Sequence, residues 1–310
     1  MSQFSAVFDR PIIILACPRS GSTLLFETLK KATSLWSIGD ESHAVIEHIP
    51  EFSTVYNGFK SNQLTENDGD LRTVSLLKSR FQAQLRNSSN IPYDQLKNGA
   101  IRFLEKTPKN SLRIRFLKKV FPDALFIHLI RDPKDNVSSI IDGWQSKHFI
   151  TYPNLPGFNN RWSYLLPPNW QNLQGKSIPE IASFQWASCN QAIYDELSQM
   201  PKENYHVVNY QDFLDNTSEV VNKLCEFIGI AYDTELKNYC EKPLPYSRYT
   251  LSKPQKNKWL KLKDDLIEPM SKLSELTSNL NSLAAPFSPY KINNEINTSI
   301  DAENPVKDKP

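Results

Sequence analysis

The sequence contains few cysteines and no hydrophobic run of membrane-spanning length. Its four cysteines, Cys17, Cys189, Cys225 and Cys240, form no CxxC pair and have no interleaved histidines at metal-ligand spacing. A disulfide framework is therefore not expected, and no metal site is predicted. The first residues have neither the basic segment nor the long apolar segment of a signal peptide. We therefore expect a soluble cytoplasmic protein without a membrane span.

An excess of charge of either sign is also absent. The 310 residues include 36 lysines and arginines and 34 aspartates and glutamates, which gives a formal net charge of +2. A protein that binds nucleic acid through bulk positive charge is therefore excluded, although a local basic pocket is compatible with this composition. Hydrophobic residues make up 39% of the chain and aromatic residues 11%, which is enough for a substantial core.

The chain also lacks a Walker A motif. No GxxxxGK[ST] pattern occurs, so the lysine that reaches the β- and γ-phosphates of ATP in such proteins is missing. Residues 11–25, PIIILACPRSGSTLL, nevertheless have the order of a strand, a tight loop and the start of a helix. A β-branched apolar run leads into residues 18–23, and apolar residues then recur at helical spacing.

The loop 18–23 has the features of an anion-binding site. A loop after a strand can direct successive backbone N–H groups and a helix N-terminus toward one point. Its side chains supply one guanidinium and three hydroxyls around a glycine, from Arg19, Ser20, Gly21, Ser22 and Thr23. These groups suit a phosphate or sulfate better than a carboxylate. We therefore expect the chain to bind a phosphorylated nucleotide.

Strands and helices alternate along much of the chain. We expect strands at 12–17, 101–106, 124–130 and 205–210, and helices at 23–33, 71–85, 110–120, 134–144, 178–199, 217–229 and 260–275. Strands that are apolar throughout are typical of a parallel sheet covered by helices on both faces. The polar segments 18–23, 106–110 and 131–139 each follow a strand. Because ligands of such sheets bind beyond the carboxyl ends of the strands, these segments should border one crevice.

The chain is expected to form one domain over residues 1–290. Residues 145–175 contain many aromatic residues among prolines, glycines and asparagines. A long aromatic loop after a strand often acts as a substrate lid, and we expect that role here. Residues 291–310 are strongly polar, and we expect them to form a disordered tail.

Two motifs resemble the nucleotide-binding motifs of one enzyme family. Residues 18–25, PRSGSTLL, look like the 5′-phosphosulfate loop of the sulfotransferases that use 3′-phosphoadenylyl sulfate (PAPS). Arg131, followed eight residues later by Ser139, is similar to the 3′-phosphate motif of that family. Further short matches, at 39–43, 105–108, 208–210 and 251–253, most resemble the tyrosylprotein and related bacterial branch. The resemblance covers about residues 10–260. It implies an α/β, P-loop-like three-layer fold with a central parallel sheet flanked by helices.

The resemblance implies that PAPS is the co-substrate and PAP the product. Arg19 and the backbone of residues 20–23 would hold the 5′-phosphate and the departing oxygen, and Lys106 would add positive charge near the bridging oxygen. Arg131 and Ser139 would bind the 3′-phosphate, the group that distinguishes PAPS from ATP. Further nucleotide contacts carried over from the family are Tyr210 and Ser252. Tyr210 could equally pack in the core at the end of its strand.

Attack by a hydroxyl acceptor requires a group that takes its proton. Residues 36–50 have the mixed pattern of a short strand end that leads into a loop. Glu41 is the first choice, because it lies on this loop and matches the base position of the tyrosylprotein branch. His43 is the alternative, since imidazole titrates near neutral pH and other sulfotransferase branches use histidine. These two residues, with Lys106 and Arg19, form the expected catalytic set.

Two departures from the tyrosylprotein pattern limit the resemblance. Gly143 stands where that pattern has an arginine, four residues after Ser139, and the secretory anchor of that branch is absent. The expected acceptor is therefore a hydroxyl of a small molecule, lipid or carbohydrate. Two other interpretations remain open from the sequence: a P-loop small-molecule kinase and a catalytically inactive nucleotide-binding protein.

Overall fold

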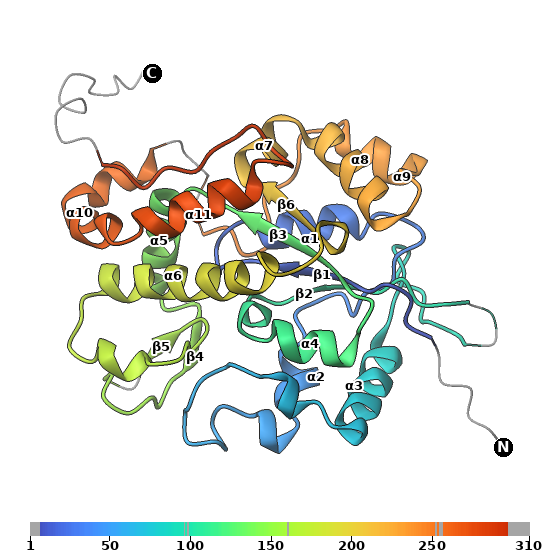
Figure 1. Ribbon diagram of the computed structural model, residues 1–310, viewed down its shortest axis with the longest axis horizontal. Helices are drawn as coiled ribbons and strands as arrows, with labels where there is room; N and C mark the ends of the chain where they lie inside the picture. The colour runs from blue at the N-terminus through green and yellow to red at the C-terminus, as the bar shows by residue number, and fades with distance from the viewer. Residues whose placement is uncertain are drawn as a thin grey trace.

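A four-stranded parallel sheet forms the centre of the molecule (Figure 1). The computed structural model describes residues 7–95, 97, 99–159, 161–251, 253 and 257–296. The strand order is β2-β1-β3-β6. The bounds of these strands are Leu104–Lys106 (β2), Ile12–Leu15 (β1), Leu125–Ile130 (β3) and Tyr205–Asn209 (β6).

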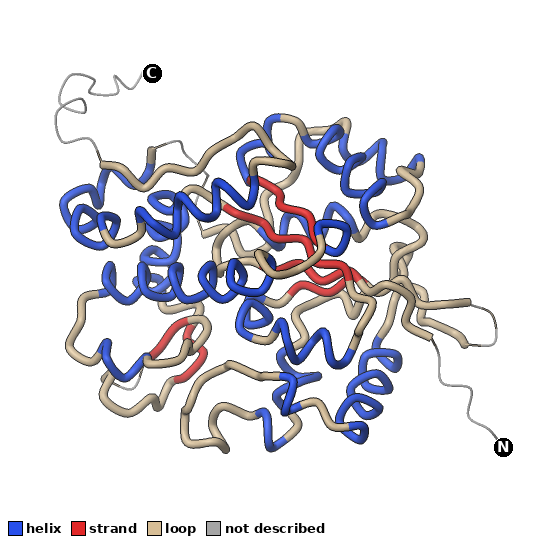
Figure 2. The backbone as a smooth tube through the Cα atoms, viewed as in Figure 1, coloured by secondary structure: helices blue, strands red, loops and turns tan. Residues whose placement is uncertain are grey.

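Helices cover both faces of this sheet. Because side chains of a strand alternate between its faces, Ile12 and Ile14 belong to one buried cluster and Ile13 and Leu15 to another. The first cluster is completed by α1 (Ser22–Leu29), α7 (Tyr210–Asp215), α8 (Thr217–Ile228) and α9 (Thr234–Cys240). The second is completed by α2 (His43–Glu47), α3 (Leu71–Gln84), α4 (Ile114–Val120), α5 (Pro133–Ser146), α6 (Ile178–Leu197), α10 (Lys263–Ser271) and α11 (Ser274–Ala284). Figure 2 shows the strands between the two groups of helices, which confirms the expected three-layer α/β fold.

Short elements complete the structure. A separate antiparallel pair is formed by β4 (Ile150–Tyr152) and β5 (Trp162–Ser163). Six 3₁₀ helices are described: η1 (Pro50–Phe52), η2 (Glu66–Asp68), η3 (Pro108–Leu112), η4 (Trp170–Leu173), η5 (Lys202–Asn204) and η6 (Lys258–Leu262). None of the helices within the described residues combines the length and the apolar surface needed to cross a bilayer.

The register of the strands brings their carboxyl ends to one edge of the sheet. Ile14 on β1 pairs with Lys106 on β2 and with Ile127 on β3, and Ile130 at the end of β3 pairs with Asn209 at the end of β6. The segments that follow these strands therefore all start from the same edge.

Helix α5 begins directly after β3 and carries the next polar motif along this edge. Asp132 caps the helix, and its carboxylate accepts a hydrogen bond from the backbone N–H of Lys134 at 3.1 Å. Pro133 occupies the first helical position, where its missing N–H costs nothing.

The C-terminal part differs from the sequence prediction in two ways. The prediction of a single helix at 260–275 is wrong, because the chain turns at residues 272–273 and continues as α11.

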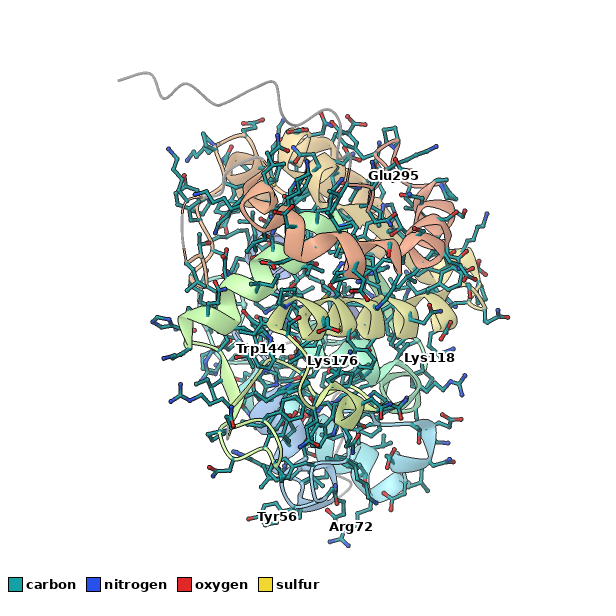
Figure 3. The ribbon with its side chains drawn as sticks, turned by 90° about the vertical axis from the view of Figure 1, so that its left-hand side faces the viewer. Tyr56, Arg72, Lys118, Trp144, Lys176 and Glu295 are labelled. Atoms are coloured by element: carbon teal, nitrogen blue, oxygen red, sulfur yellow. The ribbon has the colours of Figure 1, made fainter. Side chains whose placement is uncertain are left out.

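The second difference concerns residues 291–296, which were expected to be disordered but pack on the domain. Ile292 is 3% exposed, and its backbone N–H donates to the side chain of Asn281 at 2.9 Å. A few apolar side chains thus anchor a segment whose composition is polar. Glu295 belongs to this segment and lies at the opposite end of the molecule from Tyr56 and Arg72 (Figure 3).

One carboxylate joins α2 to the segment after β2. Glu47 Oε1 lies 2.8 Å from Nζ of Lys109 and 2.6 Å from Nη2 of Arg113, a fully buried side chain. Burial alone would raise the pKa of Glu47, but the charges of Arg113 and Lys109 outweigh it and lower this pKa from 4.5 to about 2. The cluster fixes α2, which begins at His43.

Replacing Glu47→Gln should lower the free energy of unfolding by about 3 kcal/mol at neutral pH, because it leaves two buried cations without their carboxylate. The folded-state pKa of Glu47 is below its unfolded value of 4.5, so this contribution is present above that pH and is lost as the pH falls toward about 2. Urea unfolding at neutral pH and at about pH 3 should show the difference shrinking in acid.

The matched control is Glu219→Gln, which removes an exposed pair with Lys223 on α8. It should change stability at neither pH, since exposed pairs contribute little. A loss from Glu47→Gln that is equally large in acid would contradict the assignment.

Candidate active site

The loop after β1 has the conformation of an anion-binding turn. Arg19 and Gly21 have φ angles of 66° and 100°, so the chain passes twice through the left-handed region before α1 begins at Ser22. The first N–H groups of a helix have no intrahelical partner and carry partial positive charge. The loop and this helix start can therefore hold a phosphate or sulfate oxygen.

Tyr210 packs directly on this loop. A Cβ at position 21 would lie 2.2 Å from Cε2 of Tyr210, so only glycine fits there. The guanidinium of Arg131 lies over the same ring, with Cζ 4.8 Å from the ring centroid. Tyr210 also packs on the apolar cluster formed with α1, α7, α8 and α9, and it lines the cavity described below. The expected core contact is therefore present, and the nucleotide contact stays a prediction.

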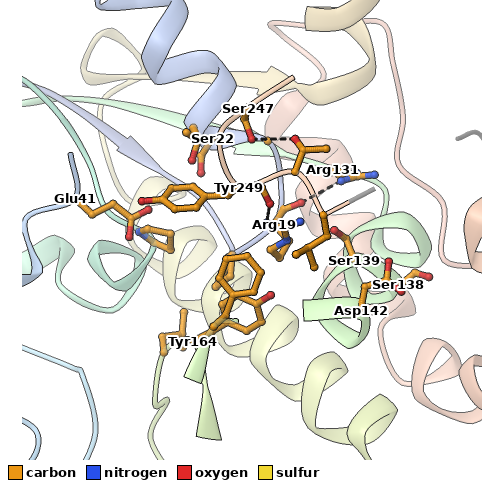
Figure 4. Close-up of a pocket in the computed structure, with 18 of the residues that line it drawn as sticks. Arg19, Ser22, Glu41, Arg131, Ser138, Ser139, Asp142, Tyr164, Ser247 and Tyr249 are labelled. Carbon is orange, nitrogen blue, oxygen red and sulfur yellow. Dashed lines mark hydrogen bonds between the residues drawn. The ribbon is translucent and has the colours of Figure 1, made fainter. Parts of the chain in front are cut away.

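A cavity of about 350 Å³ opens at this edge of the sheet (Figure 4). Of the residues predicted from the sequence, it is lined by Arg19, Gly21, Ser22, Thr23, Glu41, His43, Arg131, Ser139 and Tyr210. Nη1 of Arg131 donates to the backbone oxygen of Arg19 at 3.0 Å. The two arginines expected at opposite ends of a nucleotide therefore border the same cavity.

Two of the predicted residues that the structure describes do not line the cavity. The side chain of Ser20 is buried, with 1% of the residue exposed. Lys106 is also buried, and its Nζ donates to Oγ1 of Thr23 at 3.1 Å. Ser252 lies outside the described residues. Within the part of the chain that the structure describes, no group of three or more His, Cys, Asp or Glu side chains is placed to hold a metal ion.

Glu41 is held by two basic side chains. One of its oxygens accepts a hydrogen bond from Nζ of Lys106, and the other lies 2.7 Å from Nε2 of His43. Burial alone would raise the pKa of Glu41, but His43 and Lys106 outweigh it and lower this pKa to about 2. Glu41 is therefore ionised at neutral pH and can accept a proton, more readily once Lys106 turns its charge toward another anion.

A buried carboxyl supports the segment that carries Glu41. Oε1 of Glu105 accepts hydrogen bonds from Oγ of Ser42 at 2.6 Å and from Nδ2 of Asn110 at 3.1 Å. Burial raises the pKa of Glu105. Because Ser42 lies between Glu41 and His43, this network fixes the backbone from which both side chains project.

The segment expected to act as a lid folds around its own apolar cluster. β4, β5 and η4 enclose buried residues that include Tyr152, Leu155, Trp162, Leu166 and Trp170. Its cavity-facing residues are Phe149, Ile150, Thr151, Tyr164 and Leu165. The aromatic composition of 145–175 indicated that the segment borders the site, but no pattern within it distinguished these residues from the others.

Sequence reasoning also missed Tyr249 and Ser138. Nη1 of Arg19 donates to the backbone oxygen of Tyr249 at 2.6 Å, across 230 residues of sequence. Ser138 lines the cavity, and its buried Oγ has no hydrogen-bond partner among the described residues. No local signal identifies Tyr249, whereas Ser138 is adjacent to the predicted Ser139.

Comparison with known proteins identifies a family. A model of the sulfotransferase family matches residues 11–234, which is most of the chain. No curated protein sequence matches this chain. Among solved structures, a sulfotransferase from Alicyclobacillus acidocaldarius is 12% identical, with a TM-score of 0.51, and the match covers 90% of this chain and 97% of that one. Likeness at this level of identity shows the fold alone.

Two further solved structures have lower scores. The sulfotransferase domain from the curacin biosynthetic pathway is 20% identical, with 84% of this chain and 98% of that chain covered and a TM-score of 0.45. A mouse sulfotransferase complexed with PAP is 14% identical, with coverage of 90% and 91% and a TM-score of 0.41.

Replacing Gly21→Ala should lower the free energy of unfolding by about 3 kcal/mol, because the new methyl group displaces Tyr210 and a left-handed residue gains a Cβ. Gly175→Ala is the matched control: Gly175 has a φ of 78° but nothing within 4 Å of an added Cβ. This control should lower the free energy of unfolding by only about 1 kcal/mol, the cost of a Cβ on a left-handed residue. Chemical denaturation measures both, and equal losses would contradict the close packing of Tyr210 on the loop.

Proposed function

The chain belongs to the sulfotransferase family, and on that premise we propose that it transfers a sulfuryl group from PAPS to a hydroxyl acceptor. One observation carries the proposal. A single cavity is bordered by the loop 18–23, by Arg131 and by the Glu41 carboxylate, which is paired with Lys106. These groups match the two phosphates of PAPS and the reacting centre between the nucleotide and the acceptor.

The nucleotide would be held at both ends. The 5′-phosphosulfate would lie on the loop, against the backbone N–H groups of residues 20–23 and the guanidinium of Arg19. The 3′-phosphate would lie beside Arg131 and Ser139, where a guanidinium can form paired, charge-assisted hydrogen bonds. This second contact supports PAPS rather than ATP as the ligand, because ATP has no 3′-phosphate.

The transfer would be an in-line displacement at sulfur. A bond forms between the acceptor oxygen and sulfur as the bond from sulfur to the 5′-phosphate oxygen breaks, and the electron pair leaves with PAP. Glu41 takes the proton of the acceptor hydroxyl. Lys106 stabilises the negative charge that grows on the departing oxygen.

The pairing of Glu41 with Lys106 links these two steps. While Lys106 donates to Glu41, the pKa of the carboxyl stays near 2 and the group is a weak base. As Lys106 turns toward the departing oxygen, Glu41 loses part of this stabilisation and becomes more basic. His43, whose Nε2 lies 2.7 Å from the other oxygen of Glu41, would keep the carboxylate oriented.

The acceptor would enter beside His43. The cavity wall includes Pro108, Ile150 and Leu165, which are apolar, together with the polar Thr151. A small molecule, lipid or carbohydrate that presents a hydroxyl next to an apolar surface fits this lining.

Single-turnover transfer tests the proposed function. The purified full chain is mixed with PAPS labelled in the sulfuryl group and with a metabolite extract, and the labelled product is isolated. The proposal predicts labelled sulfate ester and PAP in equal amounts. Thermal stabilisation by ATP with Mg²⁺, without stabilisation by PAP, would instead support a small-molecule kinase. Stabilisation by PAP without transfer to any acceptor would support an inactive nucleotide-binding protein.

Replacing Glu41→Gln should lower the rate of transfer by about a thousandfold, because the amide cannot take the proton of the acceptor. PAP binding, measured by calorimetry, should stay close to that of the wild type. His43→Gln keeps a hydrogen-bonding group beside Glu41 and should lower the rate by only about tenfold. The reverse order of the two effects would make His43 the base.

A further inference from the structure

We propose that Phe149 and Tyr164 position Arg19 for the nucleotide, and that Gly143 leaves the space in which Tyr164 lies. The inference rests on the function proposed above. Phe149 and Tyr164 are positioning residues, because they act on the nucleotide through the guanidinium of Arg19.

The side chain of Arg19 is fixed by a ring and a carbonyl group. Its Cζ lies 4.8 Å from the centroid of the Phe149 ring, and its Nη1 donates to the backbone oxygen of Tyr249 at 2.6 Å. Phe149 in turn stacks on Tyr164, with centroids 5.2 Å apart and planes at 23°. A guanidinium is attracted to an aromatic face, most strongly where water is excluded. The stack therefore restricts Arg19 to one orientation beside the loop.

The absence of a side chain at position 143 makes this stack possible. A Cβ on Gly143 would lie 1.5 Å from Oη of Tyr164 and 3.2 Å from Cδ2 of Phe149. Any other residue in this turn of α5 would push both rings away. The glycine that departs from the tyrosylprotein pattern is thus the residue that admits an aromatic side chain from the 145–175 segment.

The backbone at both ends of the stack is strained. Arg19 and Tyr164 each have a φ of 66°, in the left-handed region that residues with a Cβ avoid. Such conformations persist where the surrounding structure fixes them. Oη of Tyr164 is buried and has no hydrogen-bond partner among the described residues. The side chain of Tyr164 is therefore held by the stacking of its ring rather than by a hydrogen bond of its hydroxyl.

Arg19 retains a donor for a ligand. Its Nε is buried and, in the part of the chain that the structure describes, has no hydrogen-bond partner. Buried polar groups are normally paired, so this nitrogen indicates a missing acceptor. An anion on the loop 18–23 would supply that acceptor to a guanidinium already held in place by the stack.

A double-mutant cycle tests whether Phe149 affects nucleotide binding through Arg19. The full chain is used, and PAP is the ligand. Phe149→Leu should weaken PAP binding about tenfold in calorimetry, which lies between the effects of exposed and of fully desolvated cation–ring contacts. In the Arg19→Ala background the same change should weaken binding by less than about twofold, because no guanidinium is left to position. An equal loss in both backgrounds, or no loss in either, would overturn the proposal.

Two substitutions of Tyr164 distinguish the contribution of its ring from that of its hydroxyl. Tyr164→Phe keeps the stack, so its PAP affinity should stay within about twofold of the wild type, whereas Tyr164→Leu should lose about as much as Phe149→Leu. A large loss in Tyr164→Phe would show that the hydroxyl, and not the stack, acts on the nucleotide, and would overturn the proposal.

Gly143→Ala tests the space beneath the rings. Alanine is the better helix former, so inside α5 the change should be favourable unless Tyr164 is displaced. We expect PAP to bind about fivefold more weakly, because the displaced rings no longer hold Arg19. Gly99→Ala, where an added Cβ meets nothing within 4 Å, is the control and should bind PAP as the wild type does. Unchanged binding in Gly143→Ala would overturn the role of Gly143.

The outcomes also separate this inference from the function on which it rests. Failure of PAP to bind the wild-type chain would overturn the proposed function and the positioning role together. Binding of PAP by the wild type without coupling between Phe149 and Arg19 would overturn only the positioning role.

Discussion

The convergence of three cations on one edge of a parallel sheet is the constraint on which the other features of the site depend. Arg19, Lys106 and Arg131 come from segments far apart in the sequence, and the strand register places Lys106 beside Ile14 at the end of β1. Burial lowers the pKa of Arg19, and the nearby charge of Arg131 lowers it further, so these two guanidinium groups repel each other in the folded chain. Under the proposed function, a nucleotide with negative charge at both ends would relieve this repulsion.

Glu41 is the carboxylate that balances part of this charge. It pairs with Lys106 and lies on a segment that Glu105 and the Glu47 cluster hold in place. A carboxylate bound this firmly is a poor base until its partner moves. In the proposed mechanism, binding of the nucleotide and activation of the base would be two effects of one movement of the Lys106 ammonium group.

Much of the fold and the polar half of the site could be predicted from the sequence, because the signals are local. Apolar β-branched strands, the loop 18–23 and the cap of α5 are each read from adjacent residues, and the parallel sheet then requires that they meet. Phe149, Tyr164 and Tyr249 could not be identified, since their roles depend on contacts between the loop and segments more than 100 residues away. The packing of 291–296 was missed for a similar reason: the buried side chain of Ile292 anchors the segment against a polar composition.

Calorimetric comparison of PAP and AMP on the wild-type chain tests the central claim most directly, since the two ligands differ only in the 3′-phosphate. If the loop and Arg131 hold opposite ends of one nucleotide, PAP should bind at least about tenfold more tightly than AMP, the size of a charge-assisted contact to phosphate. Equal affinities for the two nucleotides would contradict it.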